Sequence, residues 1–255
     1  MDVYRELATY PVFSIDEVTR LTRNLKTSYS AMSRLMRKGL VKKIRKELYS
    51  PVNPTTGHIV ASRFQIACAI NQTAYLSHYS ALEYYGLTNQ VFNEVYVSSD
   101  IKFHYFDFEQ TRYKFVQSKT REGIIQAKHT TGVFITDLER SIIDTMKDFD
   151  KIGGLEALMY ALENIPFLDE KKLIDYLDLY HVQALYQKVG FLLERYRKEM
   201  QVSDGFFEYC QSKIGKSVRY LTSDKDADSV YHKKWKLMVP KNLFEMLSQG
   251  EDINA

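Results

Sequence analysis

Residues 14–51 read SIDEVTRLTRNLKTSYSAMSRLMRKGLVKKIRKELYSP, and this stretch decides the fold of the amino-terminal part of the chain. Ser14 and Glu17 have the spacing of a capping box, in which each side chain bonds the other residue's backbone at the start of a helix. The helix that they open is expected to run to about Arg23. A short polar turn then separates it from a second helix.

The second helix is expected to be capped by Thr27 or Ser28 and to end at Gly39, which suits the C′ position. At about 100° per residue, its larger apolar side chains fall on one side; they are Tyr29, Met32, Leu35 and Met36. The opposite side is small, hydroxylated and basic, and comprises Thr27, Ser30, Ala31, Ser33, Arg34, Arg37 and Lys38. Short side chains let a helix enter a DNA major groove, while Arg and Lys reach bases and phosphates.

A small basic hairpin follows this helix, with strands expected over residues 40–44 and 48–51 and a turn at 45–47. With a short helix expected over residues 3–9, the order of elements is that of a winged helix-turn-helix. We therefore predict a DNA-binding head at residues 1–52. Its predicted contact residues are Thr27, Ser28, Ser30, Ser33, Arg34, Arg37, Lys38, Lys42, Lys43, Arg45 and Lys46. A winged helix used only for protein contacts is the alternative.

The charges of the chain are unevenly distributed. Between Val18 and Leu82 there are eleven basic residues and one acidic residue, Glu47. From Glu83 to Ala255 there are 23 basic and 27 acidic residues. Segregation of this kind favours a polyanionic partner for the amino-terminal part, although a basic solvated surface gives the same count.

The composition sets the class of protein. A chain of 255 residues with 45% hydrophobic and 26% charged residues is one large globular domain or two ordinary ones. Two cysteines, Cys68 and Cys210, are too few for a disulfide framework and fit a reducing cytoplasm, which is the expected location. We expect no signal peptide, no membrane-spanning helix and no membrane partner.

The rest of the chain is expected to be larger and mixed, which makes the whole an α+β protein with a mixed α/β carboxy-terminal domain. We predict a linker at residues 53–62, a mixed α/β domain at 63–240 and a tail at 241–255. Helices are expected over 63–70, 77–85 and, almost without interruption, 138–213. Strands are expected over 91–97, 102–108, 113–117, 132–135, 217–221 and 236–239.

Signatures of catalysis and of metal binding are mostly absent. The chain has no GxGxxG, P-loop or HExxH motif, and its six histidines lack metal spacing. Residues 224–235 open like an EF-hand loop but have Trp235 where the bidentate glutamate belongs. The acidic pair Asp148 and Asp150 is explained by a loop after a helix, and Cys68 by burial in an apolar helix. We therefore expect no enzyme activity, no catalytic residues, no metal and no cofactor.

Two blocks in the larger part carry a resemblance: AYLSHYSALEYYGL at residues 74–87 and VFITDLERSIID at residues 133–144. Together with the basic head, they resemble the AbiEi family of antitoxins, which come from bacterial abortive-infection (type IV) toxin–antitoxin pairs active in phage defence. The resemblance covers about residues 13–193. It implies an amino-terminal domain that binds inverted repeats in double-stranded promoter DNA and represses its own operon.

The resemblance also implies that the carboxy-terminal domain opposes a nucleotidyltransferase-like toxin, directly or through the toxin's target. A monomer in solution that binds DNA cooperatively is expected. The residues of the two blocks that we assign to an antitoxin surface are His78, Glu83, Asp137, Glu139, Arg140 and Asp144.

These six residues also have structural explanations. Thr136 and Glu139 are spaced as a capping box, and Arg140 and Asp144 are spaced as a surface ion pair on one helix. His78 and Glu83 would then be polar residues that flank a helix core.

Two other functions remain open from the sequence. One is a winged-helix regulator whose second domain senses a ligand or mediates oligomerisation. The other is an enzyme, for instance a nucleotidyltransferase, with a DNA-binding appendage. The missing Gly-Ser and paired-aspartate signature speaks against the enzyme.

Overall fold

The computed structural model describes residues 3–149, 153–223 and 228–243. It is a mixed α and β protein with several sheets, and it divides into two compact units. The first comprises Met1–Ser80 and Phe92–Thr136, and the second comprises Ala81–Val91 and Asp137–Ala255. These units differ from the expected domains, because the mixed domain expected over 63–240 is shared between them.

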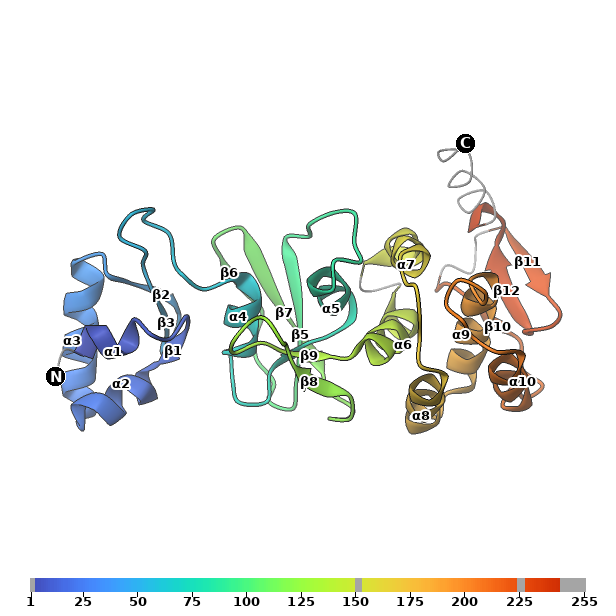
Figure 1. The fold of residues 1–255 in the computed structure, drawn as a ribbon, viewed down its shortest axis with the longest axis horizontal. Coiled ribbons are helices and arrows are strands. Elements are labelled where there is room, and N and C mark those ends of the chain that lie inside the picture. The colour runs from blue at the N-terminus through green and yellow to red at the C-terminus, as the bar shows by residue number, and fades with distance from the viewer. Residues whose placement is uncertain (1–2, 150–152, 224–227, 244–255) are drawn as a thin grey trace. The chain divides into compact units, whose positions relative to one another are not determined.

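Within the described residues 3–52, the chain forms three helices and a three-stranded sheet, which Figure 1 shows in blue at the amino-terminal end. In chain order these elements are α1 (Val3–Leu7), β1 (Phe13–Ser14), α2 (Ile15–Thr22), α3 (Leu25–Arg37), β2 (Val41–Arg45) and β3 (Leu48–Pro51). The strand order is β1-β3-β2, and both pairings are antiparallel. These elements share a separate hydrophobic cluster that includes Leu7, Phe13, Val18 and Met32.

The ends of these helices follow local sequence signals. The predicted capping box of Ser14 and Glu17 is confirmed at the start of α2. The cap of α3 is Asn24, whose side chain accepts from the backbone N–H of Thr27, so the prediction of Thr27 or Ser28 as the cap is wrong. Gly39 has φ +69°, and the N–H groups of Gly39 and Leu40 bond the carbonyls of Met36 and Leu35. This is the Schellman pattern expected for a C′ glycine.

The rest of the first unit is built around a six-stranded sheet with the order β6-β7-β5-β4-β9-β8. Its strands are β4 (Tyr75–Leu76), β5 (Glu94–Ser99), β6 (Phe106–Phe108), β7 (Thr111–Gln117), β8 (Ile124–Gln126) and β9 (Phe134–Thr136). Helix α4 (Arg63–Cys68) precedes the sheet, and α5 (His78–Tyr84) follows β4. The short strands β4 and β8 were not predicted, and the strand expected over 102–108 is limited to β6.

The second unit is mainly helical and ends in a small sheet. Its elements are α6 (Leu138–Asp148), α7 (Gly154–Glu163), α8 (Glu170–Tyr180), α9 (Gln183–Arg195), α10 (Asp204–Ser212), β10 (Arg219–Tyr220), β11 (Ser229–His232) and β12 (Leu237–Pro240). The sheet has the order β10-β12-β11, and β11 was not predicted. Predictions for Asp150, for the loop at 224–227 and for residues 244–255 of the tail lie outside the described residues.

The core of the second unit closes around Trp235, the single tryptophan of the chain. Its side chain is fully buried, and its indole N–H donates to a carboxylate oxygen of Glu194 at 2.7 Å. The ring lies directly against the backbone of Gly190 on α9, where a Cβ atom would come within 2.2 Å of it. Helix α9 therefore packs closely against the segment that leads into β12, and the amide of Gln187 on the same helix also bonds the carbonyls of Trp235 and Lys236.

None of the helices in the described parts of the chain combines the length and the apolar run that crossing a membrane requires.

Candidate nucleic-acid interface

Helix α3 presents a continuous exposed face. Its exposed residues are Leu25, Lys26, Thr27, Tyr29, Ser30, Ser33, Arg34 and Arg37, and Lys38 continues the face at the carboxyl end. A shallow groove of about 650 Å³ runs over this face, lined by basic, hydroxyl and apolar side chains alike. No acidic residue lines it, so the face can accept a polyanion without like-charge repulsion.

Ser28, a predicted contact residue, lies in the interior. Its side chain is fully buried, and its hydroxyl lies 3.0 Å from the hydroxyl of Thr19, 2.6 Å from that of Thr22 and 2.9 Å from the carbonyl of Asn24. Ala31, expected on the open side, is also buried. The prediction is therefore corrected at both positions: small residues let α3 pack closely against α2.

Tyr29, expected on the packed side, is exposed instead. Its side chain is 43% exposed, and its hydroxyl donates to a carboxylate oxygen of Glu47 at 3.1 Å, which raises the pKa of Tyr29. Leu25 is exposed as well. Sequence reasoning missed Leu25, Lys26 and Tyr29 as parts of this face, and the Asn24 cap, which starts the helix earlier, was the signal that would have found them.

The hairpin β2–β3 divides its predicted contact residues into two groups. Lys43 and Lys46 are exposed, and no ion pair is found for either within the described residues. Lys42 pairs with Glu109 at 2.7 Å. The guanidinium of Arg45 lies 4.7 Å from the centroid of the Phe106 ring, and burial lowers the pKa of Arg45. Lys42 and Arg45 are thus already engaged by the six-stranded sheet.

The remaining basic residues of α3 and of the hairpin are free to contact a polyanion. Across the described ranges, the structure gives no ion pair to Lys26, Arg34, Arg37, Lys38, Lys43 or Lys46. Glu47, the single acid of the basic stretch, is occupied by Tyr29 and lies in the hairpin turn with φ +62°. The predicted contact residues that the structure keeps exposed, with no ion pair to any of the cations among the described residues, are therefore Thr27, Ser30, Ser33, Arg34, Arg37, Lys38, Lys43 and Lys46.

The residues assigned to an antitoxin surface are placed differently. All of them except Glu83, which is half-buried, are buried. Asp137 caps α6 by accepting from the backbone N–H of Arg140 at 3.0 Å, so the cap is Asp137 and not Thr136. The structure therefore does not show these residues as an exposed surface, and it favours the structural explanation.

These buried groups are satisfied by side chains of α8. The hydroxyl of Tyr176 donates to Asp137 at 2.7 Å, and the ammonium of Lys172 lies 3.2 Å from Asp137 and 3.4 Å from Glu139. Burial, followed by the neighbouring carboxylate, raises the pKa of Tyr176. Burial alone would lower the pKa of Lys172, but Asp137 and Glu139 hold it above its ordinary value.

Arg140 and Asp144 form an ion pair at 3.4 Å, with both side chains almost fully buried, so the pair is not at the surface. The hydroxyl of Tyr180 also donates to Asp144, and burial with this carboxylate raises the pKa of Tyr180. The network ties α6 to α8 and serves packing.

His78 and Cys68 are also buried. The Nδ1 atom of His78 lies 2.8 Å from the hydroxyl of Ser77, and the backbone of His78 has φ +53°. The thiol of Cys68 donates to the carbonyl of Phe134 at 3.3 Å, and burial raises its pKa to about 12. Ser77, just after β4, thus holds His78, and Phe134 of β9 holds Cys68, which is mostly the unreactive thiol form at neutral pH.

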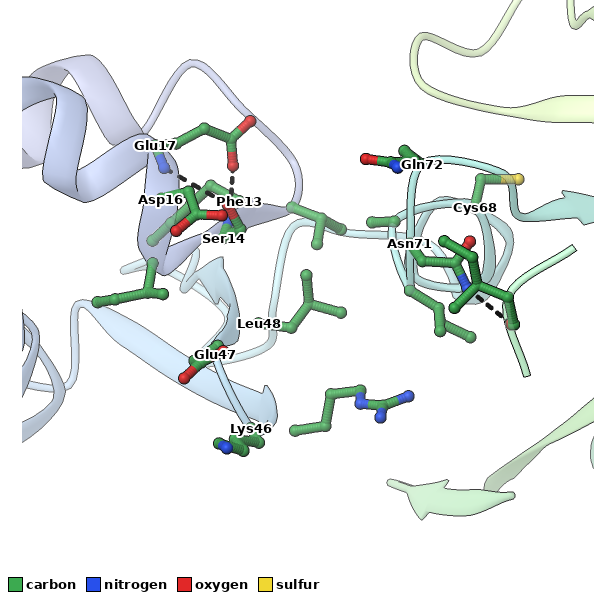
Figure 2. Close-up of a pocket in the computed structure, with 16 residues that line it drawn as sticks. Phe13, Ser14, Asp16, Glu17, Lys46, Glu47, Leu48, Cys68, Asn71 and Gln72 are labelled. Atoms are coloured by element: carbon green, nitrogen blue, oxygen red, sulfur yellow. Dashed lines mark hydrogen bonds between the residues drawn. The ribbon is translucent and has the colours of Figure 1, made fainter. Parts of the chain in front are cut away.

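A second hollow lies within the first unit. Figure 2 shows it between the segment around Phe13 and Glu17, the hairpin turn at Lys46 and Glu47, and the loop at Asn71. Its volume is about 640 Å³. Across the described residues, no group of three or more His, Cys, Asp and Glu side chains is placed to hold a metal ion.

Comparison with known proteins gives similarity to solved structures. No family model matches the chain, and no curated protein matches it. Among solved structures, the chain is similar to the crystal structure of the RV2827C protein from Mycobacterium tuberculosis, with a TM-score of 0.68 and 15% sequence identity. The similarity covers 98% of this chain and 93% of the other. At this identity the likeness shows a shared fold and nothing beyond it.

Proposed function

We propose that this chain is a DNA-binding antitoxin that represses its own promoter. The observation that carries the DNA-binding part is the exposed face of α3, which is basic, hydroxylated and free of carboxylates. With the hairpin β2–β3 behind it, residues 1–52 act as a winged helix-turn-helix. Ionic contacts with phosphates supply most of the affinity of such a domain.

In this proposal α3 enters the major groove of promoter DNA. Arg34 and Arg37 reach base edges and phosphates, and the hydroxyls of Ser30 and Ser33 approach the groove floor. Leu25 and Tyr29 add an apolar surface suited to thymine methyl groups. Lys43 and Lys46 of the hairpin bind the neighbouring phosphates. Two heads on an inverted repeat give cooperative binding by a protein that is monomeric in solution.

The antitoxin part rests on the resemblance of residues 74–87 and 133–144 to the AbiEi family. Since five of the six assigned residues are buried, we infer that these blocks maintain the fold and that other, exposed residues oppose the toxin. The toxin is nucleotidyltransferase-like and is opposed directly or at its target, in the cytoplasm of a bacterium. In this proposal the chain itself has no enzymatic role.

A ligand-sensing regulator is the second candidate, and the hollow of Figure 2 favours it. A small molecule bound there would touch both the hairpin turn at Lys46 and Glu47 and the loop at Asn71. It would therefore change the freedom of the hairpin to contact DNA. Two observations together would favour this candidate over the antitoxin: a metabolite that changes the affinity of the chain for its promoter, and the absence of a toxin that the chain neutralises.

The DNA-binding part is tested by titrating labelled promoter DNA at several salt concentrations. With six available cations neutralising about six phosphates, log affinity should fall with log salt at a slope of about −5. Arg34→Ala should cost about 1–3 kcal/mol and relax sequence preference, whereas Lys46→Ala should weaken all sequences alike. Arg121→Ala is the control, because Arg121 is an exposed arginine paired with Asp100 outside the head. A flat salt response would refute the assignment.

The antitoxin part is tested by growth of cells that express the neighbouring toxin gene. The full chain with Arg34→Ala and Arg37→Ala should still rescue growth while losing promoter binding. Failure of the unmodified chain to rescue any adjacent toxin would contradict this part of the proposal and leave the DNA-binding result standing by itself.

A further inference from the structure

The small sheet of the second unit has one covered face and one open face. On the covered face, Trp235, Leu237 and Val239 are fully buried. The ring of Trp235 packs edge-on against Phe207 of α10, with ring centroids 6.4 Å apart, and against Gly190 of α9. Figure 1 shows α9 and α10 beside β10 and β12.

The open face carries a row of large side chains across all three strands. In the register of the sheet, Met238 of the central strand is paired with Tyr220 on one side and with Tyr231 on the other. Because side chains alternate along a strand, Met238 points away from the face that holds Leu237 and Val239. Paired residues share a face, so both tyrosines lie on the open one. Tyr220 is 40% exposed and Tyr231 is 47% exposed.

Positive charge surrounds this row. In the sequence, residues 213–243 carry eight basic and three acidic residues, and one of these acids, Asp228, is paired with Lys241. Lys216 and Lys233 are exposed, and the structure gives them no ion pair within the ranges it describes. Arg219 is exposed as well, but it is paired with Leu237 and therefore lies on the opposite side of the strand from Tyr220. This is a local feature, since residues 83–255 as a whole carry more acidic than basic residues.

We propose that this open face binds single-stranded nucleic acid. Two unstacked bases lie on the rings of Tyr220 and Tyr231, and the connecting phosphates lie along Lys216 and Lys233. Neighbouring strands are about 4.8 Å apart, so the two tyrosines stand about 10 Å apart with Met238 between them. Aromatic rings on a sheet beside basic residues are the usual means of holding single strands, because every base has a stackable face.

The combination of side chains favours this occupant over others. A DNA duplex keeps its bases stacked inside the helix and offers no base face to a tyrosine ring. The carboxylates of an acidic peptide would pair with the basic residues alone, and the row of tyrosines would have no role in binding it. The proposal does not depend on promoter binding by the head, because it uses different residues on a different sheet.

The test uses the full chain with Arg34→Ala and Arg37→Ala, so that the head contributes little. A fluorescein-labelled single-stranded RNA of 12 nucleotides and the DNA of the same sequence are titrated, and binding is read by fluorescence anisotropy. Tyr220→Ala and Tyr231→Ala should each weaken binding about tenfold, whereas Tyr220→Phe and Tyr231→Phe should keep it, because stacking needs only the ring. Lys233→Gln should lower the magnitude of the salt slope by about one.

Two matched variants serve as controls. Tyr105→Ala removes a tyrosine that is 65% exposed on the other unit, and Lys241→Gln removes a lysine already paired with Asp228; neither should change binding. Fluorescence of Trp235 checks that each variant is folded. Binding of RNA, DNA or both that follows the tyrosine rings supports the proposal.

Three outcomes would overturn it: no binding of either single strand, equal losses with Tyr105→Ala, or a requirement for Tyr220 and Tyr231 that appears only with duplex promoter. Gel shifts of promoter DNA with the head intact are read separately. Failure of this proposal and failure of the DNA-binding head are therefore distinguishable.

Discussion

At the scale of single residues, the size of a side chain, more than its polarity, determined which residues of α3 are buried. Ser28 and Ala31 are small and buried, and the hydroxyl of Ser28 is satisfied by Thr19 and Thr22 of α2. Tyr29, which a polarity pattern assigns to the core, is displaced to solvent and bonds Glu47. A serine in a helix can therefore be a packing residue, provided that a neighbour accepts its proton.

The buried pair of Arg140 and Asp144 gives a prediction at this scale. Arg140→Leu leaves Asp144 buried with only uncharged partners, and it should lower the free energy of unfolding by about 3–5 kcal/mol. The double variant Arg140→Leu with Asp144→Leu should recover much of this loss, since no uncompensated charge is left. Urea denaturation followed by the fluorescence of Trp235 measures both.

The matched control for this pair is Arg121→Leu, whose partner Asp100 is exposed. It should change stability by less than about 1 kcal/mol, because surface pairs contribute little. If Arg140→Leu were as mild as Arg121→Leu, the burial of the network would be contradicted.

At the scale of elements, local signals set where helices begin and end, and close approaches set how they pack. Asn24 and Gly39 define α3 through cap geometry. The contact of α9 with the final sheet is instead fixed by the absence of a side chain at Gly190, where the ring of Trp235 takes its place. A glycine inside a helix is otherwise unfavourable, so the packing of Trp235 against Gly190 offsets the low helix propensity of this glycine.

Gly190→Ala should therefore destabilise the second unit, even though alanine is the better helix former. The added Cβ would lie 2.2 Å from the Trp235 ring, and relief of such a clash costs about 1–3 kcal/mol or more. The near-ultraviolet circular dichroism of Trp235 and the urea midpoint should both change.

Gly205→Ala on α10 is the control, since the nearest atom to its Cβ is the Ser203 hydroxyl oxygen at 3.4 Å. It should be close to neutral. In a Trp235→Leu background, with urea unfolding followed by far-ultraviolet circular dichroism, the effect of Gly190→Ala should shrink sharply, and an unchanged effect there would show that the clash is not the cause.

At the scale of the whole molecule, the chain passes between its two units more than once, because residues 81–91 belong with 137–255. Leu82 is fully buried in the core of the second unit. The head, by contrast, has a hydrophobic cluster formed entirely by residues within its first 52 positions. Cutting the chain at one position can therefore separate the head from the rest of the chain, but it cannot separate the two units from each other.

This organisation predicts how fragments behave. Residues 1–57 should be helical by circular dichroism, with a weak cooperative transition because so short a chain buries little surface. Residues 137–255 alone should unfold without cooperativity and bind a hydrophobic dye, and a peptide of residues 78–91 added in trans should restore part of the transition. A cooperative, dye-free fragment 137–255 would contradict the division into units.

The sequence by itself determined the local features of this protein. Caps, glycine positions and apolar periodicity predicted α2, α3, the hairpin and the long helical region, because these depend on residues close together in the chain. Charge segregation likewise identified the basic face, apart from its exact membership. The two sequence blocks suggested a family but not which of their residues are exposed.

Only the tertiary structure decided the rest. Strands β4 and β8 have only two and three residues and leave no pattern of their own, and β11 lies in the stretch that opens like an EF-hand loop. Strand β4 exists because β5 and β9, which lie farther along the chain, complete its hydrogen bonds. Burial of Asp137, Glu139 and Arg140 depends on α8, about thirty or more residues later in the chain. The row of Tyr220, Met238 and Tyr231 is brought together by sheet register. Non-local pairing of this kind is set by the packing of the whole unit, which no short stretch of sequence contains.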